Sequence, residues 1–418
     1  MKKIVLAGLT VAAVAATSFA ADVKISGSYD LRGFALDNTD FNANDDNGTD
    51  ARFYDQRVRV QAVMKASDAI SVTLRSDLSE GDWGTNDTQS NNGGNKFRLD
   101  RAFLTMKLPS NLGTLTAGTI GYDIERTGLL LNLHRNDGFL YTNTFGMVGV
   151  EAGNIKVEDS ELNVGVTAEG DRDVYLVKAT VKPMDNLTVS PYFVYDNDKD
   201  EALGANVKRM ALGVDAGFKA GMFGVDGTLY MIDGKEETPG AVDKDLEGLV
   251  FNLMANVKPI PGLTIGAGYT YMQGDDNAAD NENEAIVSFV DGDPGNNPMR
   301  GFIFWNDYSH DGAKLYGTDG KNVSQPASGY FNGINAFKLY ADYAFDKFGV
   351  GAHAIYAEDA ETVTGANEKE ITEFGVYGSY KIYDNATLTL QLATAELDEA
   401  NTQRDDATFA GLGLSVKF

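Results

Sequence analysis

Apolar residues recur at every second position along most of this chain, and this period-two pattern most constrains the fold. The C-terminal segment is the clearest case, with Ala410, Leu412, Leu414, Val416 and Phe418 on one parity. Because a β-strand points successive side chains to opposite faces, each such segment has one apolar face and one polar or small face. About 18 segments show the pattern, most of them long enough for a tilted strand to cross a bilayer.

The connections between these segments alternate between short and long. Short turns are expected at residues 66–68, 109–111, 184–186, 259–261, 346–347 and 384–385. Long polar stretches separate them at residues 37–51, 80–96, 119–138, 196–206, 233–246, 274–333, 358–370 and 397–406. A soluble β-sandwich also alternates in hydrophobicity, but it has no reason to segregate its loops by length. A transmembrane barrel has short periplasmic turns and long external loops.

Aromatic residues end several apolar faces, as an interfacial girdle requires: Tyr195, Tyr271, Tyr343, Tyr380 and Phe418. We therefore predict an all-β fold, a closed antiparallel transmembrane β-barrel of 18 strands. The count falls to 16 if a weak hairpin around 153–172 is miscounted. The apolar parity also slips within 96–108, which indicates a bulge or a short lipid-facing band.

The first 20 residues have the features of an export signal. Lys2 and Lys3 precede an apolar run over residues 4–16, and Ser18 and Ala20 are the small residues that a signal peptidase accepts. The run is too short to span a bilayer as a helix. We expect cleavage after Ala20, export to the bacterial outer membrane, and a single barrel domain over 21–418.

Composition restricts the partners and the chemistry. The formal net charge is −26, and it becomes −28 once the two lysines of the signal are removed. Such acidity argues against binding nucleic acid. The chain has no cysteine, which rules out thiolate metal sites and cysteine nucleophiles. No acidic stretch keeps the spacing of an EF-hand, so no metal site and no cofactor is expected.

Three segments resemble the Gram-negative general porins. The run RAFLTMKLPSNLGTLTAG (Arg101–Gly118) is similar to the hairpin of their fourth and fifth strands, and RNDGFLYTNTFG (Arg135–Gly146) to the strand after their third loop. The closing GLGLSVKF, with Phe418 last, resembles the signal read by the barrel-assembly machinery. The resemblance implies a homotrimeric diffusion pore whose third loop folds into the barrel. The 18 strands and the 60-residue loop 274–333 depart from that family, so a substrate-selective, sugar-type 18-stranded channel is the alternative.

The resemblance also implies a charged constriction, and strand parity permits it. Parity directs four arginines to one stretch of the inner wall: Arg57, Arg59, Arg75 and Arg101. The third loop carries Asp123, Glu125 and Arg126. Acids on the loop opposite arginines on the wall would set a transverse field at the narrowest point, which favours polar solutes. Ordinary polar lumen residues would show the same parity.

We expect passive diffusion of small hydrophilic solutes and ions through a water-filled lumen. Acidic loops such as 196–201 and 396–400 predict a mild cation preference and contacts with lipopolysaccharide. An outer-membrane enzyme needs a histidine coupled to a serine or an acid. The chain has only His134, His310 and His353; His353 has no nearby serine, and His310 beside Asp311 in the long loop is a weak signal, so catalysis is disfavoured. A plugged importer is disfavoured because strands begin directly after the predicted cleavage site. A surface adhesin is compatible with a pore but leaves the lumen-facing cations unexplained.

Overall fold

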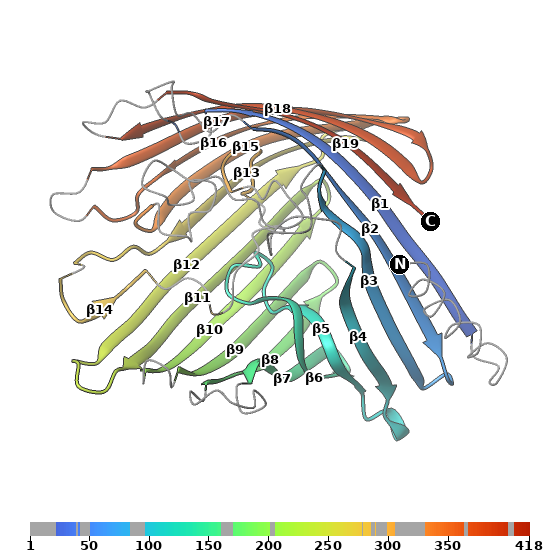
Figure 1. The fold of residues 1–418 in the computed structure, drawn as a ribbon, viewed down its shortest axis with the longest axis vertical. Coiled ribbons are helices and arrows are strands. Elements are labelled where there is room, and N and C mark those ends of the chain that lie inside the picture. The colour runs from blue at the N-terminus through green and yellow to red at the C-terminus, as the bar shows by residue number, and fades with distance from the viewer. Residues whose placement is uncertain are drawn as a thin grey trace.

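The chain folds into one β-barrel wall (Figure 1). The computed structural model describes residues 22–38, 41, 51–83, 97–159, 170–200, 205–277, 279–285, 289, 299–305, 331–362, 367–399 and 405–418. The predicted export signal, residues 1–20, lies outside these ranges. The strands are β1 (Asp22–Asp37), β2 (Ala51–Lys65), β3 (Ile70–Asp82), β4 (Arg98–Lys107), β5 (Thr114–Asp123), β6 (Asn132–Phe145), β7 (Val148–Asp159), β8 (Gly170–Met184), β9 (Leu187–Asp200), β10 (Ala205–Ala220), β11 (Phe223–Glu237), β12 (Lys244–Val257), β13 (Leu263–Met272), β14 (Glu282–Asn283), β15 (Ile334–Phe345), β16 (Phe348–Glu358), β17 (Lys369–Tyr383), β18 (Ala386–Glu399) and β19 (Ala407–Lys417).

The barrel is closed because the first strand pairs with the last. β1 pairs antiparallel with β2 on one side and with β19 on the other. At this seam the Gly27 N–H donates to the Phe418 carbonyl (2.7 Å), and the Phe418 N–H donates to the Gly27 carbonyl (3.0 Å). The two-residue β14 pairs with β12 outside the ring, and β13 pairs directly with β15. The wall therefore has the predicted 18 strands, and the segment around 153–172 supplies β7 and β8.

Short turns and long loops lie at opposite ends of the strands. The six predicted turns are present, and two more join β6 to β7 and β10 to β11. One of the predicted turns contains a single 3-10 turn, Pro109–Asn111. Several strands extend beyond their predicted ends, so the third loop is only residues 124–131. Among the described residues, no helix is long and apolar enough to cross a membrane.

The two faces of the wall differ as the alternation requires. Leu388, Leu390 and Leu392 are exposed on the outer face of the barrel. Their apolar surface is shielded from water only where lipid covers it. Rings stack near one rim, with Phe345 against Phe348 at 5.5 Å between centroids. Inward residues and the loops form one buried apolar cluster, which includes Val174, Val194 and Tyr230. Much of the barrel interior is therefore filled by side chains.

A β-bulge explains the parity slip in β4. The pairing of β3 with β4 shifts between Arg75 and Ser76, so Asp100 has no partner across the ladder. An extra residue in one strand moves all later side chains to the other face. Leu99 and Leu104 can thus both face outward, while Asp100 and Arg101 both face the lumen.

Candidate functional site in the barrel lumen

Four predicted arginines lie together on the inner wall formed by β2, β3 and β4. On β2, Tyr54 is 57% exposed outside while Asp55 is fully buried, so Arg57 and Arg59 share the inner parity with Asp55. Arg59, Arg75 and Arg101 converge on the carboxylate of Asp100, and Arg57 lies 4.0 Å from Asp30. These four arginines thus lie close together on the inner wall, on the face that strand parity predicts.

Wall carboxylates pair with these arginines, and the sequence reasoning missed them. Asp77 accepts from Arg59 Nε at 2.6 Å, and Asp100 from Arg135 Nε at 3.0 Å. Within the described residues, this arginine wall extends to β1 and β6 and holds seven arginines and five carboxylates: Arg32, Arg57, Arg59, Arg75, Arg98, Arg101, Arg135, Asp30, Asp55, Asp77, Glu80 and Asp100. The wall therefore keeps an excess of two positive charges.

Asp123 lies beside this wall at the end of β5. The guanidinium of Arg101 lies across Gly121, where a Cβ would overlap it, so a larger residue there would displace the Arg101 side chain. Asp123 follows two residues later with an exposed side chain. Of the predicted loop acids, Asp123 is the one that the structure places near the arginines.

Glu125, a predicted constriction residue, is turned into its own loop and, among the described residues, makes no hydrogen bond or ion pair with a wall arginine. Its side chain is 3% exposed, and it accepts hydrogen bonds from within its own loop. The donors are the Thr127 N–H (2.5 Å), the Thr127 hydroxyl (2.6 Å) and the Leu130 N–H (3.0 Å). Burial raises the pKa of this carboxyl, and these three donors oppose the rise. Glu125 is thus a residue that shapes the loop.

The third loop turns into the barrel, as predicted (Figure 1). Ile124, Leu130 and Leu131 are fully buried and belong to the interior cluster. The Lys178 ammonium on β8 donates to the Ile124 carbonyl at 2.5 Å, and Arg126 pairs with Asp226 on β11. Arg126 is therefore tied across the lumen from the arginine wall and does not join that cluster.

The long loop 274–333 also enters the barrel, at Phe289 and at residues 299–305. The Phe289 N–H donates to the Leu130 carbonyl of the third loop at 2.9 Å. The Phe289 carbonyl accepts from Arg172 and Arg209, which both pair with buried Asp196. The long loop is therefore fixed to the third loop and to β8–β10.

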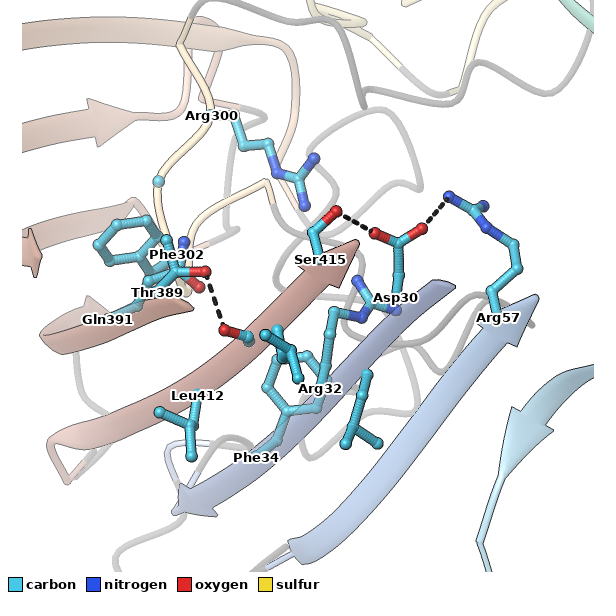
Figure 2. Close-up of a pocket in the computed structure, with 14 residues that line it drawn as sticks. Asp30, Arg32, Phe34, Arg57, Arg300, Phe302, Thr389, Gln391, Leu412 and Ser415 are labelled. Carbon is cyan, nitrogen blue, oxygen red and sulfur yellow. Dashed lines mark hydrogen bonds and ion pairs between the residues drawn. The ribbon is translucent and has the colours of Figure 1, made fainter. Parts of the chain in front are cut away.

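A second part of the long loop borders a hollow of about 520 Å³ (Figure 2). Arg300 and Phe302 line it from the loop, and Asp30, Arg32 and Arg57 line it from β1 and β2. Thr389, Gln391 and Ser415 add hydroxyl and amide groups from β18 and β19. The Ser415 hydroxyl donates to Asp30 at 2.7 Å. The hollow thus combines three guanidinium groups with one carboxylate.

In the described part of the chain, no histidine belongs to a catalytic triad with a serine and an acid. His353 Nε2 lies 2.8 Å from Glu373 Oε1, and its ring packs on Phe302. His310 and the side chain of His134 lie outside the described residues. At the predicted assembly signal, the exposed Phe418 ring lies over Gly27, at the seam.

The fold matches solved structures, although no protein-family model and no curated protein matches the chain. Similar structures include OccK9 (OpdG) of Pseudomonas aeruginosa, with a TM-score of 0.59, 14% identity, and coverage of 94% of this chain and 99% of that one. OpdK of the same organism, crystallised with vanillate, gives 0.57 at 12% identity over 94% and 98%. OccAB4 of Acinetobacter baumannii gives 0.57 at 13% identity over 94% and 98%. At these identities the likeness is one of fold.

Proposed function

We propose that this chain forms an outer-membrane channel for passive, substrate-selective diffusion of small hydrophilic solutes. The observation that carries the proposal is a closed 18-stranded barrel whose two in-folded loops lie opposite an arginine-rich wall. A barrel of this size encloses an aqueous lumen unless loops fill it. The loops here enter the lumen without forming a separate domain among the described residues, which favours a narrowed channel.

The comparisons favour the substrate-selective alternative over the general porin. The solved structures of similar fold are substrate-specific channels of the Occ and OprD type. OpdK was crystallised with vanillate, which carries a carboxylate. The excess of arginine on the wall offers a carboxylate the bidentate partner that it prefers. We propose that solutes with a negative group are selected at this wall.

We assign the selective region to the wall arginines Arg57, Arg59, Arg75 and Arg101 together with Asp123. Arg126 and Glu125 belong to the loop that lies opposite, Arg126 as a tie to β11 and Glu125 as an internal support. The predicted mild cation preference depends on the net charge of the loops, whereas the wall attracts anions. Salt screens the attraction between a distant ion and the acidic loops at the mouth of the barrel. The wall arginines act on a solute that is in contact with them, so salt screens their effect less.

Export after cleavage at Ala20, assembly through Phe418, contacts with lipopolysaccharide, and a homotrimer remain proposals from the sequence. Conductance steps in groups of three would support the trimer. Two-step or single-step insertion at all protein concentrations would argue against it.

The test is single-channel recording of the purified protein in a planar bilayer under a salt gradient. Steady ohmic steps that are reduced by vanillate or benzoate on one side would support a selective channel. Steps that no carboxylate reduces would favour the general porin. Well-inserted protein that conducts no ions would refute the proposal.

A further inference from the structure

The segment 299–305 of the long loop is folded around a single buried carboxylate. Glu373 on β17 is fully buried, and it accepts from three consecutive backbone N–H groups. The Phe302 N–H donates to Oε1 at 2.6 Å, while the Ile303 and Phe304 N–H groups donate to Oε2 at 3.1 and 2.6 Å. Glu373 therefore fixes the backbone path of a loop that is 70 residues away in sequence.

Side chains around Glu373 complete this attachment. His353 on β16 contacts Oε1 at 2.8 Å, and Lys338 on β15 donates to the Arg300 carbonyl at 2.7 Å. A Cβ added to Gly301 would lie 2.5 Å from Glu373 Oε2, so the loop approaches this closely only with glycine there. Met299, Ile303, Phe304 and Trp305 are buried around the contact. Both charge and shape thus fit the segment to this wall.

The attachment determines where Arg300 lies. Arg300 directly precedes the residues that bind Glu373, and Figure 2 shows it pointing into the hollow that Asp30 and Arg57 line from the other side. Arg300 thus supplies a cation from a loop to a site whose other cations belong to the barrel wall. The wall arginines are set by strand register, whereas Arg300 belongs to a loop segment that Glu373 and Lys338 bind.

We propose that Glu373 is a positioning residue for ion selectivity: it holds segment 299–305 against the wall and thereby places Arg300 in the hollow. The inference rests on the proposed channel function for its electrical consequence. The attachment itself does not depend on that function, and it can be tested separately.

The first experiment follows the attachment through Trp305. The chain has two tryptophans, so a Trp83→Phe background leaves Trp305, which is 1% exposed, as the reporter. In Glu373→Gln the amide turns an N–H toward at least one backbone donor. We expect the Trp305 emission to shift to longer wavelength and its quenching by acrylamide to rise. Glu370→Gln, an acid on the same strand without a contact to the segment, is the matched control.

A second variant covers the case in which Glu373→Gln does not fold. Gly301→Ala leaves the carboxylate intact but inserts a methyl group into the contact, so it should produce the same spectral shift. Folded barrel is scored by heat-modifiable gel mobility. An unchanged Trp305 spectrum in either folded variant would overturn the attachment, whatever the protein conducts.

The second experiment measures reversal potentials under a KCl gradient. Arg300→Gln should lower the anion-to-cation permeability ratio by about 25-fold, because one unit charge about 4 Å away in water changes the anion occupancy about fivefold and the cation occupancy about fivefold in the opposite direction. Glu373→Gln removes a negative charge, so direct electrostatics alone would raise the ratio. Because Arg300 is displaced, we expect the ratio to fall instead.

The double variant separates positioning from direct electrostatics. In the Arg300→Gln background, Glu373→Gln should cause no further fall in the ratio. A rise in the ratio for Glu373→Gln alone, or additive falls in the double variant, would refute the role through Arg300. Failure of all variants and of the parent to conduct would instead count against the proposed channel, while the Trp305 result would still stand.

Discussion

The carboxylate of Asp100 is the centre of the arginine wall, and its removal is a quantitative test of the wall. Asp100 is 2% exposed and accepts from Arg75 and, at 3.0 Å, from Arg135. Arg59 and Arg101 lie 3.5 and 3.9 Å away. In Asp100→Asn, four guanidinium groups share one fewer negative charge, and the excess on the wall rises from two positive charges to three.

The size of the effect follows from this geometry. A unit charge at about 4 Å in water contributes about 1 kcal/mol to the energy of an ion, a factor of about five in occupancy. Because the anion gains this factor and the cation loses it, we expect the anion-to-cation permeability ratio to rise about 25-fold at 0.1 M salt. The effect should fade at 1 M, where the Debye length is about 3 Å. The Asn oxygen still accepts from one arginine, so the loss of one charge-assisted hydrogen bond should cost about 2 kcal/mol of stability. Partial exposure of the arginines reduces this cost.

The assay is the reversal potential across a planar bilayer at both salt concentrations. Asp68→Asn is the matched control, because it removes the same charge from an exposed turn between β2 and β3. Equal ratios for Asp100→Asn and Asp68→Asn would refute local control by the wall. A shift of Asp100→Asn toward cations would refute the sign of the argument.

Three further predictions concern the loops and the seam. Glu125→Ala removes the acceptor for three hydrogen-bond donors of the third loop, and each donor left unsatisfied in a buried place should cost about 1–3 kcal/mol of stability. The chain should then become cleavable by trypsin at Arg126, and resistance equal to that of the parent would contradict the supporting role of Glu125. Arg126→Gln breaks the pair with Asp226 and should increase current noise in single-channel records, whereas quiet open levels would show that the tie is dispensable. Phe418→Ala keeps the two backbone hydrogen bonds to Gly27 but removes the ring, so it should lower the cellular yield of heat-modifiable barrel and leave the conductance of the folded fraction unchanged; an unaltered yield would argue against the assembly signal.

The alternation of apolar residues predicted most of the fold because it follows directly from strand geometry. The parity of 410–418 predicts β19, and the parity around Arg57 and Arg59 predicts their inward direction. Asp55 lies two residues before Arg57 and shares its parity, so strand parity also predicts that this wall carboxylate points inward. The directions of Arg98 and Asp100 could not be predicted in this way, because the bulge in β4 reverses the parity on one side of it.

The internal attachments of the loops could not be predicted from local pattern. The Glu125 side chain binds donors two and five residues ahead only because the loop closes around it. Glu373 meets residues 302–304 through the tertiary fold alone, and its spacing along the chain carries no signal. The resemblance to general porins depends on short motifs, whereas the count of 18 strands favours the substrate-selective channel.

The two attachments of the long loop also have a mechanical consequence for the wall. Phe289 is fixed to β8–β10, and residues 302–304 are fixed to β17, so the thirteen residue steps from 289 to 302 link different sides of the ring. Such a stretch reaches at most about 45 Å. A wide ring of strands is easily flattened by lateral pressure, and a tether of limited length resists outward bending of the two sides that it joins. The long loop therefore acts as a cross-tie that limits how far the cross-section of the barrel can elongate.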